Sequence, residues 1–505
     1  MGGLTGPKMR GESERRGFVW RAEWIVLLLL SALVLLFLAY QVYGLQAGYS
    51  YWFDELFSVV AGKLPVGEAV GVYINDPHPP FYPLLLTGWI ALFGDSEAAT
   101  RSLSVIFALG TLWVLSMTVA RVGRRVVAMM LVIVLSNWLI CHYAQEARPY
   151  AALLFVSAMV FAFAVNDRRG PLLLTLVLLG LTHYFGALQA FAYLAWLAAF
   201  ESRTLRSWLG LAAAGTAILV WPAIFLVVGR GMSLVGGNFW IEATPADALR
   251  QSAMASAPWL WDAVDRFAGL VGLDAGAGGL LLRLAAVAGI GILLLVRLRG
   301  AGAGEGMRRN VLRAAFVALL TTLGAAAINL HTPVSTDRNF IVMVPLASYL
   351  LAEAIAAVWR SRAGAGFAVA GLAVIALVGQ LQIRDVMAGR FLPHQDWHWV
   401  ADAVVAEAGR TGGGTYFYSR WGSGFYHRLS AYYMPEGQEV GIVEMEKLGQ
   451  LEPGAIVFFG NLVGHLDGAR CVTELQQALD ARGMLYRAEF ANQAARCSNG
   501  YVVLE

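Results

Sequence analysis

The sequence predicts a polytopic α-helical membrane protein with about 11 transmembrane helices, a surface helix in the first outer loop and a small C-terminal α/β domain. Of the 505 residues, 58% are hydrophobic and 14% are charged, whereas an ordinary soluble domain has roughly 25% charged residues. The apolar residues gather in blocks close to the ~20 residues that a helix needs to cross the hydrocarbon core. Only the last part of the chain has the mixed composition of a soluble domain.

The apolar blocks predict eleven spans. The first apolar block, 24–42, follows five basic residues. It is long and has no small-residue cleavage site, so we interpret it as part of a retained span rather than a signal peptide. The predicted spans lie at 23–43, 101–120, 125–142, 148–165, 171–184, 186–200, 208–229, 277–297, 311–331, 338–358 and 364–383.

The distribution of arginine predicts the orientation. Basic clusters at 121–125, 168–169, 203–206, 297–313 and 360–362 all fall on the side of the N-terminus when these spans are counted. Positive residues favour the cytoplasmic side. We therefore expect a bacterial inner-membrane protein with a cytoplasmic N-terminus and a periplasmic C-terminal domain.

Two apolar segments need separate treatment. The stretch 81–93 is too short to span, and its preceding prolines with Tyr82 and Trp89 favour a helix lying at the membrane surface. The pair 171–184 and 186–200, interrupted around His183, is either two tilted spans or two partial helices.

The domain boundary is predicted near Pro393, giving a membrane domain at 1–392 and an extracytoplasmic α/β domain at 393–505. Cys471 and Cys497 both lie in this second domain, and an oxidising compartment makes a disulfide between them plausible. The periodicity predicts helices at 396–408 and 470–482 and strands at 415–419, 455–459 and 501–504.

The predicted topology gathers carboxylates, histidines and two arginines on the outer side, as an extracytoplasmic active site requires. Each has a simpler interpretation: an acidic pair is commonly solvated, His-Pro-Pro commonly begins a helix, and Glu146 with Arg148 can form a weak surface ion pair. Their joint placement favours function. The candidates are Asp54, Glu55, Asp76, His78, Glu146, Arg148, His183, Tyr184 and Arg338.

The order of these motifs resembles the bacterial protein-mannosyltransferase and aminoarabinose-transferase-like branch of the GT-C superfamily. The resemblance is carried by Asp54-Glu55 after the first span, then Asp-x-His-Pro-Pro-Phe-Tyr at 76–82, then Gly-Asp-Ser-Glu at 94–97 with Arg101, then Ala-Gln-Glu-Ala-Arg-Pro-Tyr at 144–150. It is strongest from Trp24 to Tyr184 and returns around Arg338-Asn339, where the family typically has Arg-Tyr.

The resemblance implies a GT-C fold and the inverting transfer of a sugar from a polyprenyl-phosphate donor to lipid A, another envelope glycan or a protein. Inversion needs a base for the acceptor hydroxyl, for which Asp54 is the candidate with Glu55 beside it. The leaving phosphate needs cationic partners such as Arg148, His78 and Arg338. The remaining candidates would orient these groups or bind substrate. A divalent metal held by Asp54, Glu55, Asp76 and His78 is an open alternative, and no nucleic-acid partner is predicted.

Two other classes of function compete with this hypothesis. A transporter or flippase for a polar or lipid-linked substrate would have related halves and ionisable groups near the midplane. A scaffolding protein would use its terminal domain to bind a partner. The sequence contains no clear repeat, and its polar candidates are predicted at one surface, which favours the transferase.

Overall fold

A computed structural model describes residues 7–76, 78–228, 241, 243–270, 277–300, 303–359, 361–391, 396–418, 428–429, 431–460, 464–467, 470–491 and 499–505. The chain forms two compact units. One comprises the chain up to Tyr43 together with Tyr73–Pro83 and Ser102–Val386, and the other comprises Gly44–Val72, Leu84–Arg101 and the chain from Met387 onward. The first contains most of the apolar helices, and the second contains the β-sheet.

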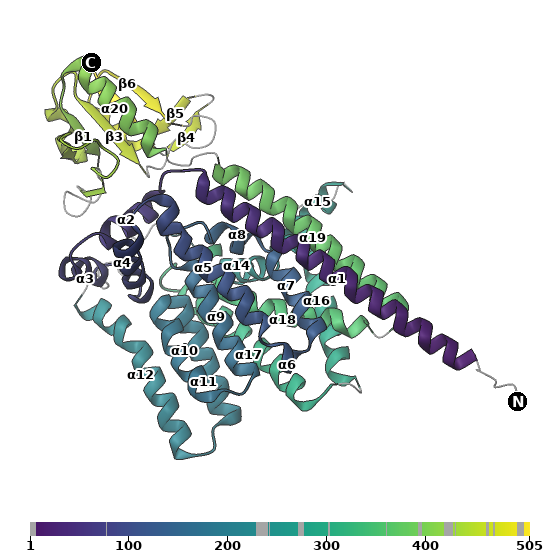
Figure 1. The fold of residues 1–505 in the computed structure, drawn as a ribbon. Helices are drawn as coiled ribbons and strands as arrows, with labels where there is room; N and C mark the ends of the chain where they lie inside the picture. The colour runs from purple at the N-terminus through teal and green to yellow at the C-terminus, as the bar shows by residue number, and fades with distance from the viewer. Residues whose placement is uncertain are drawn as a thin grey trace, which may run out of the picture. The chain divides into compact units, whose positions relative to one another are not determined.

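Seven helical segments in the described part of the chain are long and apolar enough to cross a membrane by length and composition. They coincide with seven of the predicted spans (Figure 1). They are formed by α1 (Pro7–Gln46), α5 (Glu97–Ser116) with α6 (Val119–Val122), α12 (Leu205–Val227), α16 (Ala277–Arg299), α17 (Glu305–Ile328), η2 (Asp337–Met343) with α18 (Val344–Val358), and α19 (Arg362–Phe391).

The other four predicted spans are also helical, but their helices are shorter. The stretch 125–142 is divided between two helices because Asn137 caps the second one, its side chain accepting a hydrogen bond from Leu139 N–H at 3.0 Å. The elements are α7 (Arg124–Leu135), α8 (Trp138–Tyr143), α9 (Tyr150–Val165), α10 (Arg169–Thr182) and α11 (Tyr184–Trp196), which continues into the π-turn η1 (Leu197–Glu201).

The interruption expected around His183 is a single extended residue between α10 and α11. His183 has φ −163° and ψ 150°, and its Nδ1 accepts a hydrogen bond from Phe185 N–H at 3.2 Å. The two helices meet closely there, because a Cβ on Gly186 would lie 2.2 Å from the carbonyl oxygen of Leu179. Glycine therefore permits the tight junction that places His183 at a helix N-terminus.

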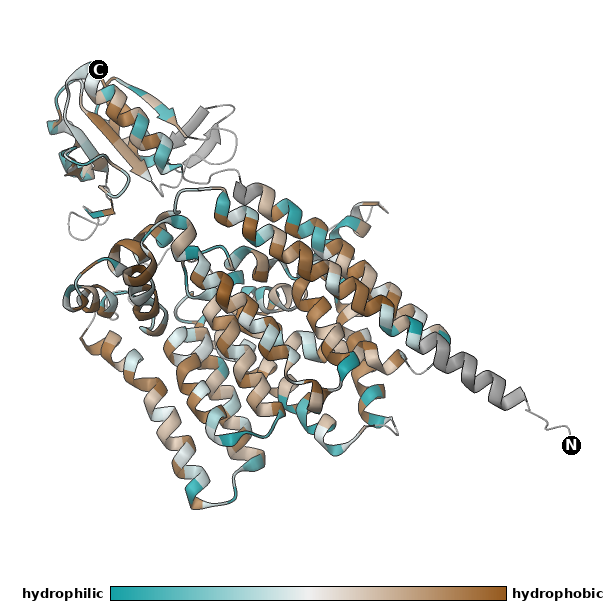
Figure 2. Cartoon of the chain, in the orientation of Figure 1, coloured by the Kyte–Doolittle hydropathy of each residue, from teal (hydrophilic) through white to brown (hydrophobic). Residues whose placement is uncertain are grey.

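The membrane helices differ in how much of their surface the protein covers. The most apolar window of Asp337–Val358 is 78% buried, whereas that of Gly278–Arg299 is 6% buried. Leu28, Leu281 and Phe367 are among the large apolar side chains left exposed, and Figure 2 shows hydrophobic residues along α1, α12 and α19. Since a soluble protein rarely exposes such apolar surface, these faces are suited to lipid.

Polar contacts hold η2 against the helices around it. The Ser157 hydroxyl and the Gln189 amide both donate to the carbonyl oxygen of Val342, at 2.9 and 2.8 Å. Ser157 lies on α9 and Gln189 on α11. Buried polar groups of this kind are hydrogen-bonded because an unmatched one is costly. The contacts fix the segment that carries Arg338.

Further helices occur in the sequence between the membrane-spanning candidates. The predicted surface helix is α4, which has the expected bounds Phe81–Phe93. It follows α2 (Phe53–Gly62) and α3 (Val66–Ile74). Two helices between predicted spans, α14 (Pro245–Ser256) and α15 (Pro258–Leu270), were not predicted. Both begin at proline, and Thr244 caps the first by accepting from Asp247 N–H.

The C-terminal part contains a mixed five-stranded sheet in the order β2-β1-β3-β7-β6. β1 pairs parallel with β2 and β3, while β7 pairs antiparallel with β3 and β6. Two further strands form a separate hairpin. The elements are α20 (Trp397–Thr411), β1 (Thr415–Tyr418), β2 (Gly441–Val443), η3 (Met445–Gln450), β3 (Ile456–Gly460), β4 (Gly464–Asp467), β5 (Arg470–Thr473), α22 (Glu474–Asp480), β6 (Tyr486–Phe490) and β7 (Asn499–Leu504).

The central strand β3 is buried on both faces, which explains its unbroken apolar sequence. Val457 and Phe459 belong to a core cluster with Leu475 and Leu479 of α22. Phe458 instead packs against Phe417 of β1, which contacts Trp397 of α20. A helix therefore covers each face of the sheet.

One secondary-structure prediction is partly wrong. The helix expected over Arg470–Arg482 begins only at Glu474, because the first four residues form β5. Val472 and Thr473 are β-branched, and Thr473 caps α22 in a reciprocal box with Gln476. The predicted disulfide partner Cys497 lies outside the described residues, so its pairing with Cys471 stays a prediction.

Candidate active site

The two acidic residues after the first span lie in the first turn of α2. Carboxylates are favourable there because the helix N-terminus carries partial positive charge. Phe53, Leu56 and Val60 are buried at helical spacing and anchor the opposite face. These buried side chains fix the position of the helix and therefore of its two carboxylates.

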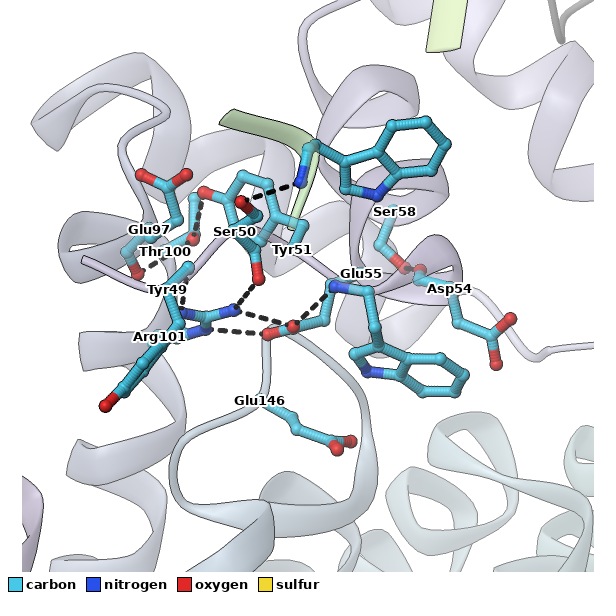
Figure 3. A network of polar contacts seen from close by, with 12 residues as sticks. Tyr49, Ser50, Tyr51, Asp54, Glu55, Ser58, Glu97, Thr100, Arg101 and Glu146 are labelled. Carbon is cyan, nitrogen blue, oxygen red and sulfur yellow. Dashed lines mark hydrogen bonds and ion pairs between the residues drawn. The ribbon is translucent and has the colours of Figure 1, made fainter. Parts of the chain in front are cut away.

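Glu55 is fully buried and pairs with Arg101 of α5. The guanidinium Nε and Nη2 donate to Oε1 and Oε2 of Glu55 at 2.9 and 2.8 Å. Arg101 also donates to the carbonyl oxygens of Tyr49 and Ser50, at 2.7 and 3.2 Å. One arginine therefore holds both the start of α2 and the chain leading into it (Figure 3).

Asp54 differs from its neighbour. It is half-buried, and Figure 3 shows its carboxylate directed away from the Glu55–Arg101 pair. Its own backbone carbonyl accepts a hydrogen bond from the Ser58 hydroxyl at 2.9 Å. Of the two predicted catalytic carboxylates, Asp54 is therefore the one suited to meet a substrate, and Glu55 is suited to positioning.

Tyrosines from the C-terminal part contact the segment that precedes α2. The Tyr433 hydroxyl accepts from Tyr51 N–H at 2.8 Å and donates to Glu97 at 2.8 Å. The Tyr51 hydroxyl in turn contacts the Thr100 hydroxyl at 2.7 Å. Burial, with these acidic neighbours, raises the pKa of Tyr51 and Tyr433. Both therefore act as neutral hydrogen-bonding groups.

A second tyrosine reaches the loop between α4 and α5. Tyr432 donates to the backbone oxygen of Asp95 at 2.9 Å, and Lys63 pairs with the Asp95 carboxylate at 2.5 Å. Burial raises the pKa of Asp95, but Lys63, together with hydrogen bonds from the backbone and Tyr432, holds it below its usual value. Trp397 N–H also donates to the Ser50 hydroxyl at 3.1 Å. Gly44–Val72 and Leu84–Arg101 thus belong to one unit with the C-terminal domain.

Three predicted binding residues meet in the other unit. The Asp76 carboxylate accepts from His78 N–H at 3.0 Å and lies 2.7 Å from His78 Nδ1. His78 Nε2 lies 3.2 Å from Nη2 of Arg148. Burial raises the pKa of Asp76, but its interactions with the ring and backbone N–H of His78, together with the charge of Arg148, bring it below its ordinary value. Asp76 is therefore a carboxylate at neutral pH.

His183, Tyr184 and Arg338 lie around this group. The rings of His78 and His183 have centroids 5.8 Å apart, and His183 is the same distance from Tyr150. The Arg338 guanidinium lies over the Tyr150 ring, 5.5 Å from its centroid. The Tyr184 hydroxyl is buried without a hydrogen-bond partner among the described residues. We refer to six residues as the phosphate cluster: Asp76, His78, Arg148, His183, Tyr184 and Arg338.

Glu146 does not lie at the surface, where the simpler interpretation of the sequence placed it in an exposed ion pair with Arg148. It is buried, with 4% of its surface exposed, and its carboxylate lies 3.2 Å from His142 Nε2. His142 lies near the end of α8, and Glu146 lies in the turn that follows this helix. His142 was not among the predicted site residues, because its contact with Glu146 depends on the turn after α8.

The structure also bears on the metal alternative. Across the described ranges no group of three or more histidine, cysteine or acidic residues is placed to hold a metal ion. Both oxygens of Glu55 are engaged by Arg101, and Asp76 Oδ1 is engaged by His78. The residues suggested as ligands therefore do not fit a shared metal, and no step below depends on one.

Arg101, Tyr432 and Tyr433 were not among the predicted site residues. Arg101 stood in the motif order without a role, and its spacing of four from Glu97 indicated only a shared helix face. The tyrosines lie in the last quarter of the chain, so no local pattern related them to the first loop. Their contacts are tertiary and follow from the fold alone.

The helical membrane unit and the small mixed sheet define a multi-pass membrane protein with a C-terminal mixed-sheet domain. No protein-family model matches the chain, and no curated protein matches it. The fold is that of ArnT from Cupriavidus metallidurans. Its apo crystal structure aligns with a TM-score of 0.57 and 13% identity over 94% of this chain and 98% of ArnT.

A second structure of the same enzyme, bound to undecaprenyl phosphate, aligns with a TM-score of 0.53 and 14% identity over 94% of this chain and 97% of ArnT. The family resemblance predicted from the motifs is therefore confirmed at the level of the fold. At this identity the likeness concerns the fold alone.

Proposed function

We propose that this protein is a membrane glycosyltransferase that transfers a sugar from a polyprenyl-phosphate donor to an acceptor hydroxyl outside the cytoplasm, with inversion. The observation that carries the proposal is the phosphate cluster, in which Arg148 is buried beside His78 in a membrane unit. The structural relative ArnT has been seen with undecaprenyl phosphate bound. That ligand has the headgroup such a cluster would recognise.

The chemistry of the donor explains why the cluster sits among membrane helices. A sugar attached to a long polyprenyl phosphate stays in the lipid layer, so the enzyme must bring its headgroup to a pocket while the tail remains in lipid. Arginine suits the leaving phosphate because its guanidinium donates several hydrogen bonds in a planar arrangement. In this proposal Arg148, His78 and Arg338 stabilise the charge that develops on the phosphate.

Asp54 is proposed as the general base. Its carboxylate takes the proton as the acceptor oxygen bonds to the anomeric carbon and the bond from that carbon to the carrier phosphate breaks. Glu55 and Arg101 hold the helix that presents it. In this proposal Glu146, Tyr184 and His183 contact the headgroup and sugar. Lipid A, another envelope glycan and protein remain the acceptor classes.

The transferase is distinguished from the transporter or flippase alternative by its product. Purified protein is incubated with a synthetic polyprenyl-phosphate sugar and envelope acceptors, and the products are followed by mass spectrometry. A new glycosidic product, absent without protein, supports the transferase. Donor moved across a vesicle membrane with no product made would support the flippase and overturn the proposal. Comparing envelope glycans of a deletion strain with its parent identifies sugar and acceptor.

A further inference from the structure

The protonation state of His78 follows from its two neighbours. Asp76 Oδ1 already accepts the hydrogen bond of the His78 backbone N–H, and a carboxylate only accepts hydrogen bonds. The short contact of 2.7 Å to His78 Nδ1 therefore places a proton on Nδ1. The backbone N–H of His78 donates to the same oxygen at 3.0 Å, which fixes the ring relative to the chain.

The other ring nitrogen is fixed by Arg148. A guanidinium has donors only, so Nη2 at 3.2 Å must donate to His78 Nε2, which accepts through its lone pair. His78 is thus neutral, with its proton on Nδ1. The carboxylate acts on Nδ1 as a second partner acts on many functional histidines, selecting one tautomer.

The charged and titratable groups that face His78 come from four parts of the membrane unit. Asp76 supplies one negative charge from its own segment, and Arg148 one positive charge from the turn before α9. His183, the N-terminal cap of α11, lies beside the His78 ring in a tilted arrangement. Tyr150 is close to His183, and Arg338 of η2 lies over the Tyr150 ring. The two arginines and one carboxylate leave a single net positive charge when both histidines are neutral.

A phosphate that enters the cluster changes what His78 Nε2 faces. Arg148 would direct its donors to the phosphate oxygens, which are stronger acceptors than imidazole. The unprotonated Nε2 lone pair would then face phosphate oxygens, and two acceptors in contact repel. A phosphodiester such as the sugar donor carries one negative charge, whereas a monoester carries about −1.5 to −2 at pH 7. The mismatch is greatest for the monoester.

We propose that His78 takes up one proton on Nε2 when the cluster binds a polyprenyl monophosphate, so that it changes from accepting Arg148's hydrogen bond to donating one to the phosphate. This inference rests on the proposed function, because it treats the monophosphate as the leaving group. His78 then distinguishes the spent carrier from the sugar donor by its charge. Asp76 is a positioning residue that keeps Nε2 directed at the ligand.

The charge balance of the reaction supports this role. As the acceptor O–H bond breaks, its proton passes to Asp54 and then to water, and the carrier leaves as a monoester with one more negative charge than the diester. A proton taken by His78 from water offsets that added charge. The cluster and its ligand keep the same total charge before and after transfer, which limits the electrostatic cost of the step inside the protein.

Isothermal titration calorimetry of the full-length protein in detergent tests the inference. C55 polyprenyl monophosphate is titrated between about pH 8.5 and about pH 7.5, where the free ligand is mostly a dianion, in buffers of different ionisation enthalpy. The heats give the number of protons bound. We expect uptake approaching one proton, with affinity rising about tenfold per pH unit lowered. The methyl diester of the same lipid should bind with much less uptake and a flat pH profile.

Variants separate His78 from the other histidines. His78→Gln should still bind the monophosphate, more weakly, with no proton uptake and no pH slope. Asp76→Asn keeps an oxygen for Nδ1–H but loses the charge, so uptake should shrink at the same pH. His331→Gln, at an exposed histidine outside the cluster, should behave as wild type. Tight monophosphate binding without proton uptake, or an unchanged slope in His78→Gln, would overturn the inference alone. Failure to bind either phospholipid would count against the proposed function.

Discussion

The guanidinium of Arg101 donates hydrogen bonds to both carboxylate oxygens of Glu55, and each partner is almost completely buried. The pair lies 46 residues apart in sequence and connects α5 to the first turn of α2. The same arginine also donates to two backbone carbonyl oxygens just before α2. It therefore fixes the position of the helical turn that carries Asp54.

Asp54→Asn should lower sugar transfer on the order of 10²-fold or more while the protein stays folded and binds donor. The amide matches the carboxylate in size but cannot take up the acceptor's proton. Transfer is measured by mass spectrometry, and donor binding by calorimetry. Glu68→Gln is the matched control, because Glu68 is an exposed carboxylate of the neighbouring helix α3. Turnover near wild type in Asp54→Asn would disprove the base assignment.

Glu55→Met and Arg101→Met should each destabilise the protein by about 3–5 kcal/mol, because each leaves a buried charged group without its partner. The double variant Glu55→Met with Arg101→Met should be less harmful than the sum of the two, since no unmatched charge remains. Thermal unfolding in detergent measures all three. Additive effects would show that the two residues act independently and would contradict the positioning role.

Arg148→Ala should weaken binding of the polyprenyl-phosphate donor and also reduce turnover, because it removes a partner of the phosphate in both the bound donor and the transition state. Arg148→Lys should recover part of the binding, since it keeps the charge but loses the planar pair of donors. Arg266→Ala serves as control at an exposed ion pair with Asp262. A loss of turnover with donor affinity unchanged would assign Arg148 to another task.

The orientation of the chain is tested by labelling single cysteines with a membrane-impermeant reagent. In a variant lacking the three native cysteines, Glu68→Cys should react in intact spheroplasts and Arg168→Cys should react only after permeabilisation. Both positions are exposed. The expectation follows from the arginine distribution. The reverse pattern would place the first loop in the cytoplasm and exclude an extracytoplasmic acceptor.

Cys471 and Cys497 should be joined in protein isolated from the membrane. Closing a loop of this size contributes about 3 kcal/mol in the chain-entropy description, so reduction should lower the unfolding temperature of the C-terminal domain. Thiol counting in denaturant without reductant decides the matter. One reactive thiol, from Cys141, is the expected result, and three would refute the pairing.

How far the sequence predicted the fold depended on the length of each signal. The long helices were predicted because ~20 apolar residues have few other interpretations. The short strands β2 and β6 were missed because β2 has three residues and β6 mixes polar and apolar side chains at an edge of the sheet. Such strands are defined by their pairing with distant segments rather than by local periodicity.

The candidate site shows the same division. Asp54 and Glu55 were predicted as a catalytic pair because they are adjacent, but adjacent residues of an α-helix point about 100° apart. One therefore faces Arg101 and the other faces away. Asp76 and His78, by contrast, are close enough in sequence for their contact to be local. What the sequence did not indicate is that Tyr433 meets Tyr51 across 382 positions.

The single extended residue between α10 and α11 has a consequence for the depth of the site. A helix of 14 residues such as α10 is about 21 Å long, while the hydrocarbon layer is about 30 Å thick. If Arg169 lies at one boundary of that layer, His183 lies several ångströms beneath the other. Under the proposed function, a carrier headgroup would then have to sink below its neighbouring lipids to reach His78. Sugar transfer measured in bilayers of increasing acyl-chain length should therefore slow, because the headgroup has farther to move.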